Sequence, residues 1–411
     1  MYIRRHMEQT LQKLEKMFAV VFVAGARQVG KTTLLREMKP DVRYITLDDP
    51  LVLQSAIEET GTFFRVHPPP ILIDEVQYAP ALFPYVKMLA DEQRKKGMFY
   101  MTGSQQFKMM KNVSESLAGR IGILTLLGLS VREMNADPFY EPFLPAEAYY
   151  VRRMEAVRSQ DSAKSMNYQK VWQTIHTGCM PEMQMPHMDW NLFYAAYTKA
   201  YLERDVRDLA QVGDEGKFLR FMTVLAARIG NLLNMAEVAK ETGVSAPTVE
   251  RWLSILQTSN IVYLLQPYHN NLIKRMVKTP KVYFMDTGLA AYLTRWTTPE
   301  VLANGAMAGA FFENHVTVEI MKSYCNAGIE PPLYFYRDKD MNEIDLLIEQ
   351  EGTLYPIEIK KHADPGKRDV AGFAVLDRIT NRQRGSGGVV CLYDKVLPLM
   401  GEDFVIPVGY I

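Results

Sequence analysis

The sequence is poor in cysteine and has no excess of charge of either sign. Its 411 residues include three cysteines, Cys179, Cys325 and Cys391, which are scattered and show no CxxC spacing. This excludes a disulfide framework and a cysteine zinc site, and it suits a reducing cytosol. Lys and Arg number 47, as do Asp and Glu. Any affinity for nucleic acid must therefore come from a local patch and not from net charge.

Long hydrophobic runs, repeats and low-complexity tracts are also missing. No stretch reaches the roughly 18 apolar residues that a membrane helix needs, and Met1–His6 lacks the core of a signal peptide. The seven histidines show no ligand spacing. The hydrophobic content of 48% is that of a globular protein. We therefore expect a cytoplasmic protein of two to four domains that does not bind a membrane.

What the sequence does contain is a glycine loop in a specific setting. The apolar run Val20–Val23 precedes Gly25-Ala26-Arg27-Gln28-Val29-Gly30-Lys31-Thr32, and a helical pattern follows it. This matches G-x-x-x-x-G-K-[ST] between a strand and a helix. The glycines let successive backbone N–H groups point inward around a phosphate chain, and the helix start adds its own free amides. The sequence therefore predicts an ATP site.

The spacing also predicts individual roles. Lys31 places a cation on the β- and γ-phosphates, and the Thr32 hydroxyl coordinates Mg²⁺. The residues that we expect to contact the nucleotide are Gly25, Ala26, Arg27, Gln28, Val29, Gly30, Lys31, Thr32 and Thr33.

Two carboxylates end a later apolar strand, Ile71-Leu72-Ile73-Asp74-Glu75. In open parallel sheets ligands bind at the carboxyl edge of the strands, so we expect both acids beside the glycine loop. Asp74 would hold Mg²⁺, directly or through water, and Glu75 would activate the attacking water.

Three further polar residues are candidates for this site. Ser104 or Thr102, at the end of the strand Met98–Met101, could hydrogen-bond the γ-phosphate or the water; a turn-forming role is the alternative. Arg120, before a fifth strand, could act as an arginine finger in cis or toward a neighbouring subunit, although a surface salt bridge is the interpretation that we favour.

The ordered set VFVAGARQVGKTTLL, LDDP, ILIDEVQ, TGSQQF, SLAGR, YLERDVRDL and VYFMDTGLAAYL resembles a group of prokaryotic AAA+-type ATPases. The C-terminal half of that group is catalogued as a domain of unknown function. The resemblance spans nearly the whole chain and implies ATP binding in a multidomain, DNA-associated protein.

Two short helices, one ending at Gly243 and the next capped by Ser245, predict a helix-turn-helix. The apolar runs Ile261–Leu265 and Lys281–Phe284 would form its wing. No acid lies between them, whereas Lys274, Arg275, Lys278 and Lys281 cluster, which could neutralise DNA phosphates. Winged helices also serve as protein-packing modules, so both uses stay open.

In the last part of the chain, two strands flank Glu351-Gly352. A hairpin centred there places Asp345 opposite Glu358, with Lys360 on the same face by the strand period of two. Like charges directly opposite each other need a cation between them. The alternative is a cross-strand ion pair between Glu343 and Lys360 on a solvated face.

This segment resembles the PD-(D/E)xK nuclease fold. The resemblance implies that Asp345 and Glu358 bind Mg²⁺, that Lys360 positions the attacking water, and that an upstream helical acid joins them. Glu313 fits that last role.

The expected architecture is α/β with four units. Residues 1–131 form a P-loop AAA+-type ATPase core with a parallel sheet, 132–225 a helical lid, 226–296 a winged helix-turn-helix, and 297–411 a restriction-endonuclease-like α/β domain. The expected function is Mg²⁺-dependent ATP hydrolysis coupled to a DNA-associated module that is a candidate nuclease. The alternatives are a nucleotide-switched DNA-binding or signalling ATPase without nuclease activity, and a protein-remodelling or toxin-regulating ATPase. A homo-oligomer is compatible with either.

Overall fold

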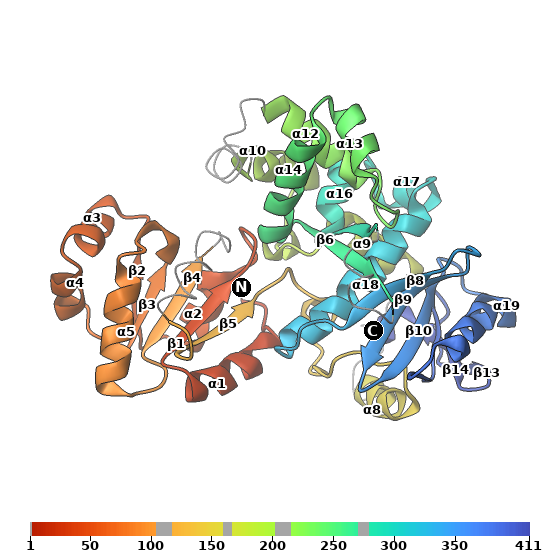
Figure 1. Cartoon of the computed structure of the whole chain (residues 1–411), viewed down its shortest axis with the longest axis horizontal. Coiled ribbons are helices and arrows are strands. Elements are labelled where there is room, and N and C mark those ends of the chain that lie inside the picture. Colours follow the sequence, from red (N-terminus) through yellow and green to blue (C-terminus); the bar gives the residue numbers. More distant parts are fainter. Residues whose placement is uncertain (1, 104–116, 159–166, 202–214, 270–278) are drawn as a thin grey trace.

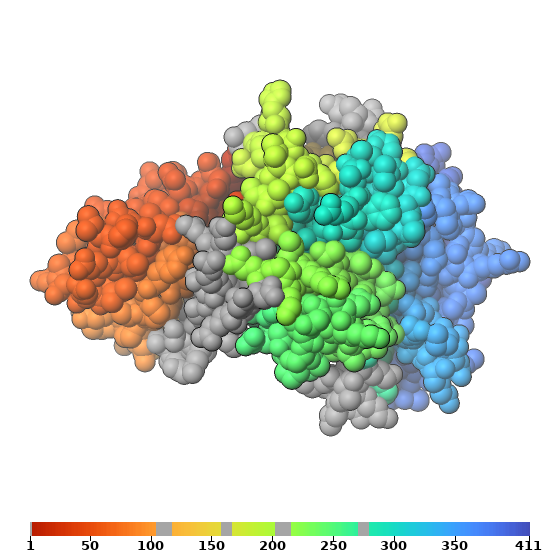
Figure 2. All heavy atoms as spheres, turned by 90° about the horizontal axis from the view of Figure 1, so that it is seen from above, coloured from red at the N-terminus to blue at the C-terminus, as the bar shows by residue number. Residues whose placement is uncertain are grey.

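The computed structural model describes residues 2–103, 117–158, 167–201, 215–269 and 279–411. Figure 1 shows a parallel-sheet domain at one end, a second and larger sheet at the other, and a group of helices between and above them. Figure 2 shows the same three parts side by side from above. Among the described residues, no helix is both long and apolar enough to cross a bilayer.

The first sheet is parallel throughout, with the strand order β2-β3-β4-β1-β5. Its strands are β1 (Val20–Ala24), β2 (Arg43–Thr46), β3 (Ile71–Asp74), β4 (Phe99–Gly103) and β5 (Ile121–Thr125). The helices that surround it are α1 (Met7–Met17), α2 (Lys31–Met38), α3 (Pro50–Glu58), α4 (Thr60–Val66) and α5 (Leu82–Gln93). The predicted α/β class and the parallel sheet are confirmed.

Both faces of this sheet are covered, which explains why its central strands are continuously apolar. Val21 and Val23 belong to the core that includes α1 and α2, whereas Val20 and Phe22 belong to the core that includes α3, α4 and α5. Alternate residues of one strand thus serve two cores. All five residues of β1 are buried, so the loop after Ala24 starts from a fixed point.

The middle of the chain is helical, as expected. Its described helices are α7 (Val131–Met134), α8 (Glu147–Arg158), α9 (Tyr168–Thr177), α10 (Trp190–Tyr201) and α12 (Glu215–Ala226), with the short 3-10 turn η3 (Pro181–Gln184). Then α13 (Met235–Thr242) and α14 (Ala246–Thr258) form the predicted helix pair. Gly243 ends α13 with φ 72°, and Ser245 caps α14 by accepting a hydrogen bond from the Thr248 amide.

The strands β6 (Val262–Pro267) and β7 (Lys281–Phe284) pair antiparallel, as the sequence predicts. The end of β6 also pairs in parallel with β8 (Leu333–Arg337), through Gln266 opposite Tyr334. The hairpin that follows the helix pair is therefore continuous with the sheet of the C-terminal part, across the expected boundary at residue 296. Sequence periodicity carries no signal for this pairing because its partners are far apart in the chain.

The C-terminal sheet has the order β13-β14-β12-β10-β9-β8-β6-β7, with β11 beside β10. Its remaining strands are β9 (Glu343–Gln350), β10 (Thr353–Ile359), β11 (Gln383–Arg384), β12 (Gly388–Cys391), β13 (Leu397–Met400) and β14 (Asp403–Pro407). Between β10 and β11 lie α19 (Lys367–Val370) and the 3-10 segment η5 (Ala371–Arg378). The β9–β10 register pairs Leu346 with Ile357 and Ile348 with Tyr355, which confirms the predicted hairpin.

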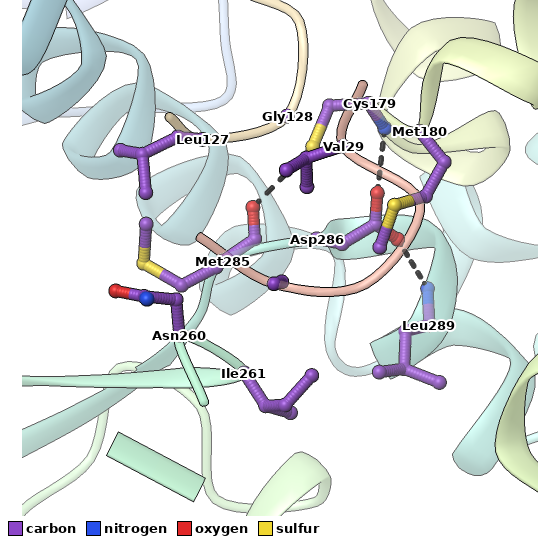
Figure 3. A pocket seen from close by; sticks show the side chains of 11 residues that line it. Val29, Leu127, Gly128, Cys179, Met180, Asn260, Ile261, Met285, Asp286 and Leu289 are labelled. Atoms are coloured by element: carbon purple, nitrogen blue, oxygen red, sulfur yellow. Dashed lines mark hydrogen bonds between the residues drawn. The ribbon is translucent and has the colours of Figure 1, made fainter. Parts of the chain in front are cut away.

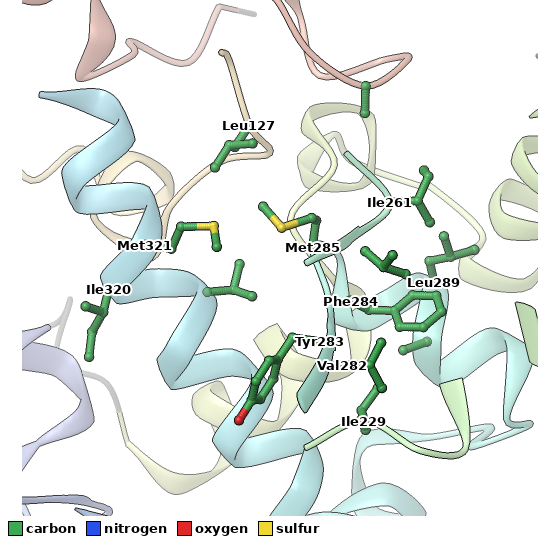
Figure 4. Close-up of a cluster of buried hydrophobic side chains, with 14 of the residues drawn as sticks. Leu127, Ile229, Ile261, Val282, Tyr283, Phe284, Met285, Leu289, Ile320 and Met321 are labelled. Carbon is green, nitrogen blue, oxygen red and sulfur yellow. The ribbon is translucent and has the colours of Figure 1, made fainter. Parts of the chain in front are cut away.

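One long helix, α18 (Ala308–Asn326), joins the parts; α16 (Thr287–Leu293) and α17 (Pro299–Asn304) precede it. The Asn314 amide hydrogen-bonds both the N–H and the carbonyl of Phe284 in β7, and Thr10 of α1 donates to the carbonyl of Asn326. Figure 4 shows Ile320 and Met321 of α18 in one buried cluster with β7 and with Leu127, which follows β5. This apolar core runs from the edge of the first sheet into the C-terminal part.

Candidate nucleotide site and carboxylate site

The glycine loop has the backbone geometry that its glycines permit. Gly25 has φ 151° and Gly30 has φ 90°, both positive values that favour glycine. Gly30 lies directly before α2, so the first amides of that helix point toward the loop. The loop thus presents successive N–H groups and a helix N-terminus from one side.

Lys31 is the first residue of α2 and is only 7% exposed. Its ammonium donates hydrogen bonds to the carbonyl oxygens of Gly25 (3.1 Å) and Ala26 (2.8 Å). The Lys31 side chain therefore folds back over its own loop. Its ammonium lies against the loop backbone that the sequence predicts to bind phosphates.

Asp74 ends β3 and is gathered with three hydroxyls. The Thr32 hydroxyl donates to its Oδ1 at 2.8 Å and the Tyr44 hydroxyl to its Oδ2 at 3.0 Å. The Thr102 hydroxyl, from the intervening strand β4, also donates to Oδ1. The structure thus brings Thr32 and Asp74 together, as expected for two oxygen donors of one Mg²⁺ site.

Glu75 follows Asp74 in a left-handed conformation, with φ 56°. Its N–H donates to the Thr102 hydroxyl at 3.3 Å, and its carboxylate accepts from the Gln77 amide. A non-glycine residue in this region of backbone space is strained, and such strain concentrates at functional sites. The Thr102 hydroxyl bonds both the Asp74 carboxylate and the Glu75 backbone amide. Ser104, the other candidate at this strand end, lies outside the described residues.

The remaining loop residues differ in exposure. Gln28 and Thr33 are exposed, Arg27 is half-buried, and Ala26 and Val29 are buried. Gln28 also has a positive φ of 62°.

Arg120 is not brought to the loop, so its expected contribution to the phosphate site in cis is wrong. It precedes β5, and its carbonyl accepts from the amide of Val20, the first residue of β1. The glycine loop follows the last residue of β1, at the opposite edge of the sheet. The Arg120 guanidinium instead pairs with Asp91 at 2.5 Å and 2.9 Å on the surface, which confirms the salt bridge. A role toward a neighbouring subunit stays a prediction.

The back of the glycine loop lies against the rest of the chain. Figure 3 shows a small pocket where Val29 meets Gly128, Cys179, Met285 and Asp286. The Arg5 guanidinium donates to the Val29 carbonyl at 2.9 Å. The sequence did not identify this junction, since its partners come from four separate segments.

Asp286 organises the far side of that junction. Its carboxylate accepts from the Cys179 amide, the Tyr194 hydroxyl and the Leu289 amide, each at 2.7 Å. One side chain therefore ties the turn after α9 to α10 and caps α16, directly behind the loop.

The C-terminal carboxylates gather as the register predicts. The Lys360 ammonium lies 2.7 Å from Glu358 and 3.4 Å from Asp345, and Asp345 also accepts the amide of Ile359 at 2.9 Å. Burial and the nearby Asp345 charge raise the pKa of Glu358. The same two carboxylates raise the pKa of Lys360 against the effect of burial. The lysine is thus the cation between two like charges.

Glu313 of α18 is bonded to the strand β7. Its Oε1 accepts from the Tyr283 hydroxyl at 2.6 Å and from the Lys281 ammonium at 3.1 Å. Burial, followed by the Asp345 charge, raises the pKa of Glu313 to about 7. The structure therefore places Glu313 within electrostatic reach of Asp345 but bonded to β7.

One expectation and one alternative about charge are wrong. Lys281 is not a wing cation free for phosphate, because it is buried against Glu313 and Glu343. Glu343 in turn does not pair with Lys360, which confirms that the Asp345–Glu358 face, and not a solvated ion pair, holds that lysine. Lys274, Arg275 and Lys278 lie outside the described residues.

Within the part of the chain that the structure describes, no three His, Cys, Asp or Glu side chains are close enough together to hold a metal ion. Mg²⁺ usually keeps several waters and takes one or two carboxylates together with substrate phosphates. Thr32 with Asp74, and Asp345 with Glu358, both offer that smaller set of oxygen donors. The donor chemistry of both sites therefore fits Mg²⁺.

Comparisons with known proteins divide the chain into three matched segments. Residues 17–135 match the family described as an AAA domain, residues 168–300 a domain of unknown function (DUF8612), and residues 308–411 another domain of unknown function (DUF4143). Uncharacterized proteins of Mycobacterium tuberculosis and Mycobacterium bovis are each 28% identical over 374 residues, which cover 88% of this chain and 75% of theirs.

Solved structures overlap more loosely. A Walker-type ATPase of Pyrococcus abyssi is 14% identical with a TM-score of 0.43, over 71% of this chain and 96% of that one. The Thermotoga maritima RuvB Holliday junction branch migration motor is 15% identical with a TM-score of 0.28, over 62% and 86%. Residues 17–135, which hold the glycine loop, thus match an AAA domain, and most of the rest of the chain matches two domains of unknown function.

Proposed function

We propose that this protein binds ATP with Mg²⁺ at residues 25–32 and hydrolyses it. The single observation that carries the proposal is the convergence of Thr32, Asp74 and Thr102 beside a loop with the phosphate-binding backbone. The AAA domain match over residues 17–135 supports the same reading.

The residues divide the work by position. The loop amides and the Lys31 ammonium hold the phosphates, with the ammonium exchanging the Gly25 and Ala26 carbonyls for phosphate oxygens. Thr32 and Asp74 would hold Mg²⁺, which supplies charge neutralisation when bound. Glu75 orients the attacking water and accepts its proton, once its carboxylate turns from Gln77.

The test is steady-state ATP hydrolysis by the full chain. Glu75→Gln should keep nucleotide binding and lower turnover by roughly 10²–10⁴-fold, the range for loss of a general base. Glu58→Gln is the matched control because Glu58 is exposed on α3 and bonds Gln54. Equal turnover in both variants would refute the role of Glu75.

We propose as a second candidate function that the C-terminal site cleaves phosphodiester bonds of nucleic acid. The observation that favours it is the grouping of Asp345, Glu358 and Lys360 at the end of one hairpin. Asp345 and Glu358 would hold Mg²⁺, and Lys360 would position water or offset developing negative charge. The helix pair α13–α14 would act as a winged helix on duplex DNA.

Two alternatives lead to different results. A nucleotide-switched DNA-binding or signalling ATPase would show DNA-stimulated turnover without cutting, and a protein-remodelling or toxin-regulating ATPase would show neither. Plasmid nicking that requires Mg²⁺ and is lost in Asp345→Asn would support cleavage. DNA that Asp345→Asn and the wild-type chain cut equally would refute it.

A further inference from the structure

Lys281 is the first residue of β7, yet its side chain is inside the protein. It is 3% exposed, and its ammonium lies 2.7 Å from Glu343 Oε1 and 3.1 Å from Glu313 Oε1. Phe335 covers it, with the ammonium 5.5 Å from the ring centroid. A lysine buried to this degree requires paired carboxylates, and here it has two.

Glu313 is fixed by two residues of the same strand. Lys281 and Tyr283 lie two positions apart in β7, so their side chains are on one face. Both donate to Oε1 of Glu313. The backbone of β7 is itself held by Asn314, the residue after Glu313, through both of its amide hydrogen bonds to Phe284. Glu313 thus has a defined partner on β7.

The charges around this point nearly balance. Four carboxylates, those of Glu313, Glu343, Asp345 and Glu358, face the ammonium groups of Lys281 and Lys360, and Arg337 lies 3.6 Å from Glu343. The Asp345 charge acts on Lys281 as well as on Glu313, which places Lys281 in the field of the same group of acids.

We propose that Lys281 is a positioning residue that serves as a built-in cation of the carboxylate site. It holds Glu313 as its own partner, so that Glu313 is not a metal ligand and the divalent cation is confined to Asp345 and Glu358. This inference deepens the second candidate function and rests on it for the identity of the site. It also means that β7, the second strand of the hairpin that follows the helix pair, supplies a charge to the carboxylate site.

The test is Mn²⁺ binding to the nucleotide-free full chain, counted by electron paramagnetic resonance of free Mn²⁺. Without nucleotide phosphates, Thr32 and Asp74 offer too few ligands to compete. The wild-type chain should bind one Mn²⁺, and Asp345→Asn should abolish that binding. Glu313→Gln should weaken it by less than about tenfold, the lower end of the range for residues outside the coordination shell.

Lys281→Met should remove the cation that pairs with Glu313, so that Glu313 and Asp345 can form a second Mn²⁺ site. Lys281→Arg should keep the wild-type stoichiometry. Arg337→Met is the matched control, since it removes a cation from Glu343 without freeing Glu313. A folded Lys281→Met chain that gains no Mn²⁺ overturns the proposal. So does a wild-type chain that binds none.

If Lys281→Met fails to fold, Glu313→Gln decides, because loss of binding equal to that in Asp345→Asn would make Glu313 a ligand. Nicking of plasmid DNA is measured on the same samples. The expected Mn²⁺ pattern without nicking refutes the cleavage function and leaves the role of Lys281 intact. Nicking with a different Mn²⁺ pattern supports the cleavage function and overturns the role of Lys281.

Discussion

Replacing Gly25 by alanine tests the loop geometry that the proposed nucleotide site requires. Gly25 has φ 151°, and an added Cβ would lie 2.2 Å from the carbonyl oxygen of Leu126. That oxygen belongs to backbone whose own amide bonds Ala24 at 2.8 Å, so it cannot move without breaking the end of the β1–β5 ladder.

The magnitude follows from two separate costs. A backbone region that only glycine adopts freely costs about 1–3 kcal/mol for alanine, and forced overlap in a packed interior costs about 1–3 kcal/mol more. We therefore expect Gly25→Ala to lose about 2–6 kcal/mol of unfolding free energy and to lose ATP binding, because the loop must shift to make room.

Two glycines provide graded controls. Gly119 has φ 76° with no atom within 4 Å of an added Cβ, so Gly119→Ala should cost only the conformational part, about 1–2 kcal/mol. Gly366 has an ordinary φ of −128° and an open neighbourhood, so Gly366→Ala should be neutral. Urea unfolding and equilibrium ATP binding give both readouts. If Gly25→Ala unfolds and binds ATP as Gly366→Ala does, the steric reasoning is refuted.

Three further predictions concern single groups. Thr32→Val removes the hydroxyl that bonds Asp74, so ATP should bind with much less dependence on Mg²⁺; an unchanged Mg²⁺ dependence in calorimetry would contradict this. Lys360→Met should abolish nicking while ATP turnover stays at the wild-type value, and residual nicking on a gel would argue against its role. Burial lowers the pKa of His315 to about 4, so the unfolded chain, with a pKa near 6.5, binds the proton first. Stability should therefore fall as pH drops from about 6.5 toward 4, by up to roughly 3 kcal/mol. His315→Leu should flatten the melting temperature between pH 7.5 and 5, and an equal slope in both proteins would refute the assignment.

The geometry of the proposed nucleotide site was largely predictable because its information is local. A strand, two glycines and a helix start define the loop within a few residues, and the order of a parallel sheet then brings Asp74 to the same edge. The β9–β10 hairpin was predictable for the same reason, since a two-residue turn fixes the register that places Asp345 near Glu358.

What the sequence did not reveal depends on contacts between distant segments. Lys281 reads as a wing cation in a stretch without acids, but α18 and β9 bring two carboxylates to it from more than 30 residues away. For Arg120 the sequence favoured a surface salt bridge over an arginine finger, and the pairing with Asp91 confirms that preference. No sequence pattern pointed to Asp286, because two of its three partners lie in other helical regions and the third lies at the start of its own helix.

Equilibrium binding of ATP with Mg²⁺ to the full chain tests the central claim most directly. We predict a single saturable site in the wild-type chain. In Lys31→Met, whose side chain keeps much of the length but not the charge, affinity should fall by at least about tenfold, the equivalent of one charge-assisted interaction of roughly 1.5–3 kcal/mol. A wild-type chain that does not bind, or a Lys31→Met chain that binds equally well, would contradict the account.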